Sequence, residues 1–288
     1  MPETVLEARG LTKNYGSVKA LDNFAVKFEK DRIYGLLGRN GAGKTTLLNI
    51  MTSRIFADGG TVTAFGQNAF ENPAVLPQIC YMPEKDLFAH KMRVRDTIEF
   101  AGEFFPNFDK PYAGRLCKLF ALDTGKRYNA LSRGYESILR IVIGLASRAP
   151  ITIFDEPVLG LDAAVRDDFY KELIDDFSKN PRTFIVSTHL IEESANIFEQ
   201  AIIIKNGRLI EQAPCDALRE NARYVTGKAD AVDAAVAGLR VIHSEIVANM
   251  KISAVYGLTP ERLSRLAASG LEISPVPVQK LFIYLTQN

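Results

Sequence analysis

Short apolar runs alternate with helical stretches through the middle of the chain. The runs Ile151–Phe154, Thr183–Ser187 and Ala201–Ile204 have the length of buried strands, and helical patterns separate them. Ile33–Leu37 is a further apolar run, and it ends in a glycine-rich segment that leads into a helix over Lys44–Ser53. Strands that alternate with helices in this way predict a parallel sheet covered by helices on both faces.

Other segments predict local β pairing and a helical region. Residues 4–30 contain two β segments joined by a turn at Asn14-Tyr15-Gly16, and residues 58–82 contain short β segments broken by glycine and proline. Asn206-Gly207 between two β segments predicts a hairpin. Residues from about 86 to 129 have a helical pattern rich in phenylalanine, and we expect one break in it, at Pro106 and Pro111.

The end of the chain predicts a second, smaller unit. Its pattern gives the order β-α-β-β-α-β and then a last helix, which is typical of a ferredoxin-like unit. The expected segments are 222–228, 230–239, 241–247, 250–257, 259–269 and 271–276. A length of 288 residues suits about two domains of roughly 150 residues each. We therefore expect one domain over residues 1–220 and a small α+β domain over 221–288.

Composition and charge narrow the class of protein. A hydrophobic fraction of 47% and a charged fraction of 24% exclude disordered and collagen-like chains. The formal net charge is only +1, so we expect no nucleic-acid partner. Cys80, Cys117 and Cys215 lack the spacing of a zinc site or a disulfide framework, which favours a reducing compartment. The sequence shows no secretory signal and no run of about 18 apolar residues, so we expect any work at a membrane to need a partner.

A phosphate-binding loop is the strongest motif in the chain. Residues 38–45, with the sequence GRNGAGKT, match GxxxxGK[ST] between a strand and a helix, which is the context that this motif requires. Backbone N–H groups of such a loop bind phosphate oxygens, Lys44 reaches the β- and γ-phosphates, and Thr45 ligates Mg²⁺. The alternative is a glycine-rich turn with a solvated lysine. The predicted nucleotide-binding residues are Gly38, Asn40, Gly41, Ala42, Gly43, Lys44, Thr45 and Thr46.

Two acidic residues end a buried strand and suit hydrolysis of a nucleoside triphosphate. The loop alone fits a kinase, a GTPase or an ATPase, but no NKxD motif for guanine is present. Asp155 and Glu156 follow the run Ile151–Phe154, and consecutive side chains at a strand end point in different directions. Asp155 can therefore hold Mg²⁺ while Glu156 faces an attacking water. The alternative is that both residues cap the next turn.

With these motifs in place, residues 4–220 resemble the nucleotide-binding subunits of ABC transporters. The resemblance implies a P-loop NTPase fold of the ABC type, with a parallel core sheet, an antiparallel β subdomain and a helical subdomain over about 86–130. It makes Glu156 the general base and places His189, in Ser187-Thr188-His189, against the γ-phosphate. It also assigns Asp162 to the D-loop and makes Tyr15 the aromatic residue that stacks on adenine.

The sequence departs from the family pattern in two motifs. The LSGGQ signature is replaced by LSRGY over residues 131–135, where Ser132 and Gly134 remain as γ-phosphate contacts. Arg133 either contributes charge to that phosphate or is solvated. The expected Q-loop glutamine is replaced by Glu84, whose carboxylate can ligate Mg²⁺ but adds negative charge near the γ-phosphate. These departures resemble a bacterial export branch of the ABC-2 type.

The resemblance also implies how the chain works with other subunits. Two ATPase subunits, identical or different, close head to tail on ATP, so that the signature turn of one completes the phosphate loop of the other. The phenylalanine-rich segment then forms a groove for a transmembrane permease subunit, or Phe100, Phe104, Phe105 and Phe108 only fill a helical core. We expect a cytoplasmic protein that is peripheral on the inner face of the cell membrane. The alternative is a non-transport ABC-type ATPase whose C-terminal domain is regulatory or acts as a sensor.

Overall fold

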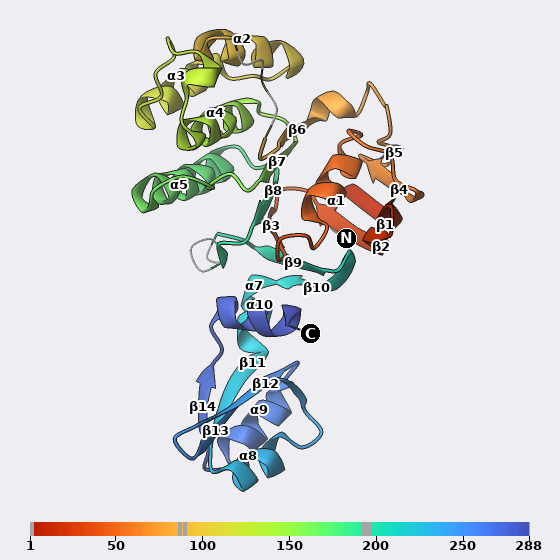
Figure 1. The fold of residues 1–288 in the computed structure, drawn as a ribbon, viewed down its shortest axis with the longest axis vertical. Coiled ribbons are helices and arrows are strands. Elements are labelled where there is room, and N and C mark those ends of the chain that lie inside the picture. Colours follow the sequence, from red (N-terminus) through yellow and green to blue (C-terminus); the bar gives the residue numbers. More distant parts are fainter. Residues whose placement is uncertain (1–2, 86–87, 89–90, 192–196, 288) are drawn as a thin grey trace. The chain divides into compact units, whose positions relative to one another are not determined.

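The computed structural model describes residues 3–85, 88, 91–191 and 197–287. It divides the chain into two compact units, the first reaching Leu190 and continuing over Ile197–Gln212, the second covering residues from Ala213 onward (Figure 1). The short helix α7 (Cys215–Glu220) therefore lies in the second unit, ahead of the boundary expected at 220/221. Each unit has its own sheet and its own apolar core.

A six-stranded sheet forms the centre of the first unit. Its order is β10-β9-β3-β8-β7-β6, and β9, β3, β8, β7 and β6 pair in parallel, as the apolar runs predict. Asn206 and Gly207 both have positive φ, 49° and 72°, in the turn between β9 and β10. The strands are β3 (Ile33–Leu37), β6 (Ile79–Met82), β7 (Ile151–Asp155), β8 (Thr183–Thr188), β9 (Gln200–Lys205) and β10 (Arg208–Pro214).

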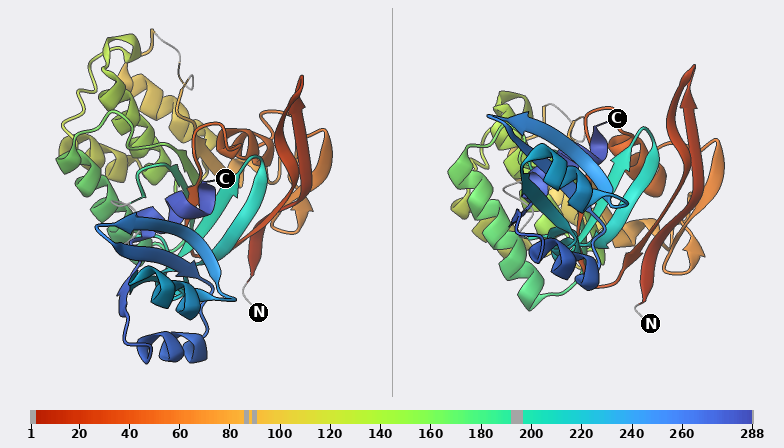
Figure 2. Two further views of the ribbon diagram at one scale, coloured as in Figure 1. Left: turned by 60° about the horizontal axis from the view of Figure 1, so that its bottom comes forward. Right: turned by 90° about the horizontal axis from the view of Figure 1, so that it is seen from below.

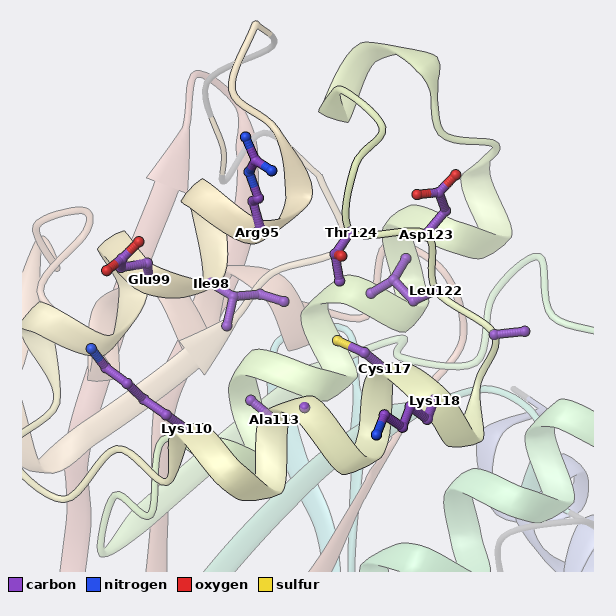
Figure 3. A pocket seen from close by; sticks show the side chains of 12 residues that line it. Arg95, Ile98, Glu99, Lys110, Ala113, Cys117, Lys118, Leu122, Asp123 and Thr124 are labelled. Carbon is purple, nitrogen blue, oxygen red and sulfur yellow. The ribbon is translucent and has the colours of Figure 1, made fainter.

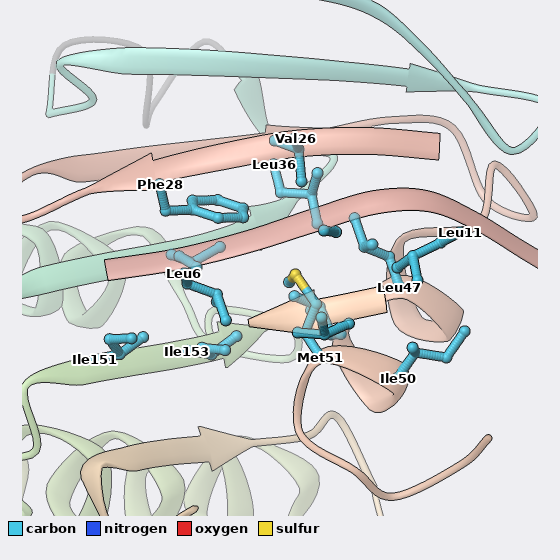
Figure 4. Packing of buried hydrophobic residues seen from close by; sticks show 14 of the residues in the cluster. Leu6, Leu11, Val26, Phe28, Leu36, Leu47, Ile50, Met51, Ile151 and Ile153 are labelled. Atoms are coloured by element: carbon cyan, nitrogen blue, oxygen red, sulfur yellow. The ribbon is translucent and has the colours of Figure 1, made fainter. Parts of the chain in front are cut away.

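A second sheet of the first unit has the order β2-β1-β4-β5 and is antiparallel. Its strands are β1 (Thr4–Tyr15), β2 (Val18–Glu29), β4 (Gly59–Ala64) and β5 (Gln67–Asn68). Helix α1 (Lys44–Met51) shares one apolar core with both sheets, where Leu6, Met51 and Ile153 are all fully buried (Figure 4). This shared core fixes the start of α1, and so the phosphate loop, against the central sheet.

Helices make up the rest of the first unit. They are α2 (Val94–Phe104), α3 (Lys110–Leu119), α4 (Arg133–Ala146) and α5 (Ala163–Lys179), with short 3-10 turns at Leu76–Gln78 and Tyr128–Ala130. The predicted break at Pro106 and Pro111 is confirmed: α2 ends before Pro106, and Pro111 lies in the first turn of α3, where it has no hydrogen bond to lose. Asp109 caps that helix through Oδ1, which accepts a hydrogen bond from the Tyr112 amide at 2.9 Å.

The second unit has the predicted β-α-β-β-α-β order. Its antiparallel sheet has the order β12-β13-β11-β14. Helices α8 and α9 lie beside this sheet (Figure 2) and share with it a small apolar core that includes Val225, Val255 and Leu266. The elements are β11 (Ala222–Gly227), α8 (Ala229–Val236), β12 (Arg240–Val247), β13 (Met250–Tyr256), α9 (Pro260–Ala267), β14 (Glu272–Pro275) and a last helix, α10 (Val278–Thr286). Among the described residues of both units, no helix is long and apolar enough to span a membrane.

Candidate nucleotide-binding site

The predicted site residues lie at the carboxyl ends of three neighbouring strands. The phosphate loop follows β3, Asp155 ends β7 and Glu156 follows it, and His189 follows β8, which lies between those strands. The parallel register pairs Leu37 with Thr188 and Asp155 with Ser187, so the three strands end at nearly the same level. Because the carboxyl ends of parallel strands form one edge of the sheet, residues far apart in the sequence come together here.

The phosphate loop needs its glycines for steric reasons. Gly41 and Gly43 have φ values of 80° and 107°, which side chains disfavour. A Cβ atom on Gly43 would lie 2.5 Å from the carbonyl oxygen of Ala20, and one on Gly38 would lie 2.7 Å from Cγ2 of Ile204. The loop therefore fits closely against neighbouring backbone and leads directly into α1.

Lys44 is buried at the first position of α1, with 6% of its surface exposed. Its Nζ donates a hydrogen bond to the carbonyl oxygen of Gly38 at 2.7 Å and lies 3.5 Å from Oε1 of Glu156. The ammonium is thus held inside the loop, facing the second acidic residue. This is where the sequence analysis placed the group that binds phosphate.

Asp155 has one satisfied and one unsatisfied carboxylate oxygen. Thr45 Oγ1 donates a hydrogen bond to Oδ2 at 2.8 Å, and the hydroxyl of Tyr81 makes a longer contact with the same oxygen at 3.4 Å. Oδ1 is buried and has no hydrogen-bond partner within the described part of the chain. A buried carboxylate oxygen of this kind needs a ligand to compensate for its lost hydration. Sequence reasoning missed Tyr81, because only the parallel pairing of β6 with β7 brings it here.

Glu156 joins the phosphate loop to the end of β8. Its Oε2 lies 2.8 Å from Nδ1 of His189, and its amide donates a hydrogen bond to the carbonyl oxygen of Ser187 at 2.9 Å. The residue is 8% exposed, whereas the His189 side chain is 41% exposed. Glu156 has a φ of 51°, a left-handed conformation that is uncommon for glutamate and typical of functional sites.

The signature residues form a separate cluster with the D-loop. Ser132 caps α4, where its Oγ accepts a hydrogen bond from the Tyr135 amide at 3.4 Å, and Asp162 caps α5 through the Val165 amide at 3.0 Å. A Cβ atom on Gly134 would lie 2.9 Å from the carbonyl oxygen of Gly160, so the two segments pack closely. Within the described residues, no hydrogen bond joins Ser132 or Gly134 to the phosphate loop.

Tyr15 and Glu84 lie outside the network of Lys44, Asp155 and Glu156. Tyr15 ends β1 with 51% of its surface exposed, and Lys13 Nζ lies 5.6 Å from its ring centroid. Glu84 follows β6 and forms an ion pair with Lys85 at 3.5 Å. An exposed aromatic ring can stack on a base.

An apolar groove of about 560 Å³ lies beside the site, between α2, α4 and the segment around β6. Phe100 and Phe104 are 51% and 57% exposed, and their rings meet edge to face at 5.0 Å. Phe108 is not among the groove residues; it lines a different pocket, and its ring lies next to Gly102 of α2. The lining includes Arg54, Leu76, Ile79, Tyr81, Met82, Phe88, Phe100, Phe104, Phe105 and Ile143.

A second hollow of about 600 Å³ lies between α2 and α3 (Figure 3). Its floor contains Ile98, Cys117 and Leu122, and its rim carries charged side chains such as Arg95 and Lys110. No residue of the predicted nucleotide site lines it.

Comparison with known proteins identifies the family. A family model described as "ABC transporter" matches residues 21–159. The chain is 30% identical over 216 residues to the ABC transporter ATP-binding protein YtrB of Bacillus subtilis, covering 75% of this chain and 74% of the relative. It is 30% identical over 227 residues to the bacitracin transport ATP-binding protein BcrA of Bacillus licheniformis, covering 77% and 74%.

Solved structures show the same fold. An ATP-binding subunit of an ABC transporter matches with a TM-score of 0.67 at 22% identity, over 75% of this chain and 92% of that one. A dimeric bacterial ABC transporter cassette matches with a TM-score of 0.65 at 20% identity, over 73% and 98%. The chain therefore belongs to the ATP-binding subunits of ABC transporters. It is an ATP-binding and ATP-hydrolysing subunit, as the sequence predicts.

Proposed function

We propose that this chain is the ATPase subunit of a bacterial ABC-2-type exporter and that it cleaves ATP with the residues at the carboxyl ends of β3, β7 and β8. The observation that carries the assignment is the position of Glu156. Its two carboxylate oxygens lie 3.5 Å from Lys44 Nζ and 2.8 Å from His189 Nδ1. A base held between a phosphate-binding lysine and a histidine suits attack of water on a γ-phosphate.

Thr45 and Asp155 are suited to hold Mg²⁺. The donor set consists of a hydroxyl and a carboxylate, the hard oxygen ligands that this ion prefers together with water and phosphate. The buried, unpartnered Oδ1 of Asp155 supports the assignment, because the carboxylate has an oxygen left for the ion's hydration shell. We assign Glu84 to the same shell as the replacement for the usual glutamine. When bound, Mg²⁺ neutralises negative charge on the β- and γ-phosphates.

The loop residues bind and orient the triphosphate. Backbone N–H groups between Gly38 and Thr46 take the phosphate oxygens, with Asn40, Ala42 and the glycines at 41 and 43 forming the turn. Lys44 adds a positive charge at the β- and γ-phosphates. Tyr15 stacks on the adenine, which gives affinity with little selectivity among bases.

Glu156 and His189 act on the water and the γ-phosphate. The carboxylate of Glu156 accepts a proton from the attacking water. At the same time the water oxygen bonds to the γ-phosphorus, and the bond between that phosphorus and the leaving oxygen of ADP breaks. His189 orients that carboxylate through Nδ1, and its Nε2 is assigned to a γ-phosphate oxygen; donation to both acceptors requires a hydrogen on each ring nitrogen. The left-handed backbone of Glu156 supports this role, since it aims consecutive acidic side chains at different targets.

A second ATPase subunit supplies the remaining contacts. Ser132 and Gly134 begin α4, and Asp162 begins α5 beside them, so this cluster presents a hydroxyl, backbone N–H groups and helix N-termini. In a head-to-tail dimer this surface meets the triphosphate on the partner's phosphate loop. Groups supplied in trans are worth about 10³–10⁵ in rate for phosphoryl transfer.

The exposed phenylalanines support docking on a transmembrane subunit. Phe100 and Phe104 keep about half of their surface exposed, so they do not merely fill a core. We assign the groove beside them to a segment of a permease subunit, which places this protein on the inner face of the cell membrane. The transport relatives named above favour this function over a non-transport ABC ATPase.

The test is the variant Glu156→Gln, which keeps the shape of the side chain and removes the base. We expect ATP binding to persist, turnover to fall by about 10²–10⁴-fold, and an ATP-bound dimer to accumulate. Glu272→Gln, at an exposed position of β14 in the second unit, is the matched control and keeps normal turnover. Normal steady-state hydrolysis by the Glu156 variant would refute the assignment of the base.

A further inference from the structure

Tyr81 lies between the metal-binding carboxylate and the apolar groove. It is the third residue of β6, and only 7% of its surface is exposed. Its hydroxyl approaches Oδ2 of Asp155 at 3.4 Å, while its ring lines the groove. The guanidinium of Arg54, another groove residue, lies 5.6 Å from the centroid of that ring.

The hydroxyl of Tyr81 remains a donor at every physiological pH. A phenol ordinarily keeps its proton up to a pH of about 10. A protonated hydroxyl beside a carboxylate donates its hydrogen to it. Oδ2 of Asp155 thus faces two hydroxyl donors from different elements, Thr45 at the start of α1 and Tyr81 on β6.

We propose that Tyr81 is a positioning residue that fixes the Asp155 carboxylate for the metal ion and links it to the apolar groove. This proposal rests on the function proposed above. It gives a role to Tyr81, which begins the Tyr81-Met82-Pro83-Glu84 stretch and to which the motifs assign none.

Two donors on one oxygen constrain the carboxylate more than one donor does. With Thr45 alone, the group can rotate about its Cβ–Cγ bond while keeping that single contact. The second contact from β6 restricts this rotation and keeps Oδ1 turned toward the place of the metal's hydration shell. Losing the second donor therefore weakens metal binding without removing any direct ligand.

Tyr81 also connects the groove to the metal-binding carboxylate. A segment that enters the groove packs against the ring of Tyr81 or displaces Arg54 from that ring, and either event shifts the hydroxyl at the other end of the rigid Tyr81 side chain. The connection therefore runs from the exposed guanidinium of Arg54, through the ring of Tyr81, to the carboxylate of Asp155.

The experiment measures metal affinity without turnover. The full chain is saturated with a non-hydrolysable ATP analogue, and Mn²⁺ binding is followed by the electron paramagnetic resonance signal of the free ion. For Tyr81→Phe we expect the Kd for Mn²⁺ to rise roughly two- to fivefold. This change is at the low end of what the loss of one hydrogen bond produces, because the contact between Tyr81 and Asp155 is long. The matched control is Tyr34→Phe, which also removes a buried hydroxyl, one that accepts a hydrogen bond from the Glu29 amide at 2.7 Å. It should leave the Kd unchanged.

A double-mutant cycle tests the link to the groove. Arg54→Ala should raise the same Kd about twofold, as expected for one exposed cation–π contact, and should add nothing in the Tyr81→Phe background. Equal Kd values for wild type and Tyr81→Phe would overturn the positioning role. Additive effects of the two substitutions, or no effect of Arg54→Ala, would overturn the link. Failure of the wild-type chain to bind the ATP analogue would instead refute the proposed function.

Discussion

The imidazole Nδ1 of His189 lies 2.8 Å from Oε2 of Glu156 and joins the ends of two adjacent parallel strands. Both residues directly follow their strands, so the contact depends on the register in which Asp155 pairs with Ser187. The histidine fixes the orientation of the carboxylate, while Lys44 approaches its other oxygen at 3.5 Å. The two contacts hold the carboxylate in one orientation.

Replacement of His189 by alanine should reduce turnover with little loss of ATP affinity. The variant loses the group that orients Glu156 and the donor assigned to the γ-phosphate, and we expect kcat to fall about 10²-fold or more. A steady-state phosphate-release assay and a binding titration separate the two quantities. His243→Ala, in the second unit, is the control. A kcat near the wild-type value would contradict the role of His189.

Replacement of Lys44 by alanine should instead remove nucleotide affinity. The buried ammonium is the one charged side chain of the phosphate loop that is held inside it. Loss of a charge-assisted hydrogen bond to phosphate predicts a Kd raised by about 10–100-fold in a fluorescent ATP titration. Lys171→Ala, an exposed lysine on α5, should leave the Kd unchanged. Unaltered affinity of the Lys44 variant would contradict the loop assignment.

Replacement of Glu84 by glutamine restores the residue that the family pattern expects. The change removes a negative charge from the end of β6, so we expect the KM for MgATP to fall by about two- to fivefold through reduced repulsion of the γ-phosphate. The effect should shrink at high ionic strength. The glutamine oxygen can still ligate Mg²⁺, so the variant tests only the extra charge. A KM that stays the same or rises would contradict a net repulsion between the Glu84 carboxylate and the γ-phosphate.

Two glycine substitutions test the packing around helices α4 and α3. A Cβ atom on Gly144 of α4 would lie 2.3 Å from Cε1 of the buried Phe154, so Gly144→Ala should destabilise the fold by about 1–3 kcal/mol. Gly114 lies in α3 with open space around it, and Gly114→Ala should stabilise by about 0.5–1 kcal/mol. Thermal unfolding followed by circular dichroism measures both. A Gly144→Ala variant as stable as wild type would contradict the observed contact.

Local patterns in the sequence were sufficient to predict most of the fold. The parallel strands, the hairpin at Asn206-Gly207 and the order of elements in the second unit each depend on residues close in the chain, and the structure confirms them. The break at Pro106 and Pro111 was also readable from the sequence, because proline is tolerated only in the first turn of a helix. The environment of each phenylalanine was not: Phe100 and Phe104 line the groove, whereas Phe108 lines another pocket.

The contacts within the site could not be predicted without the register of the strands in the sheet. Motif residues such as Lys44 and Asp155 were recognisable from their spacing in the sequence, but the residues that contact them were not. Tyr81 approaches Asp155 only because β6 pairs with β7, and no spacing rule connects residues 74 positions apart. The positive φ of Glu156 likewise comes from tertiary structure and has no signal in the residue itself.

In the dimer proposed above, Ser132 of one chain seals the ATP site of the other. Ser132→Asp keeps a capping side chain on α4 but places a negative charge toward the partner's triphosphate. In the Glu156→Gln background, light scattering with ATP should show a dimer, whereas Glu156→Gln with Ser132→Asp should bind ATP and remain a monomer. Ser132→Asn, a neutral cap, is the control and should still dimerise. An ATP-bound dimer of the Ser132→Asp double variant, equal in stability to its parent, would contradict the account.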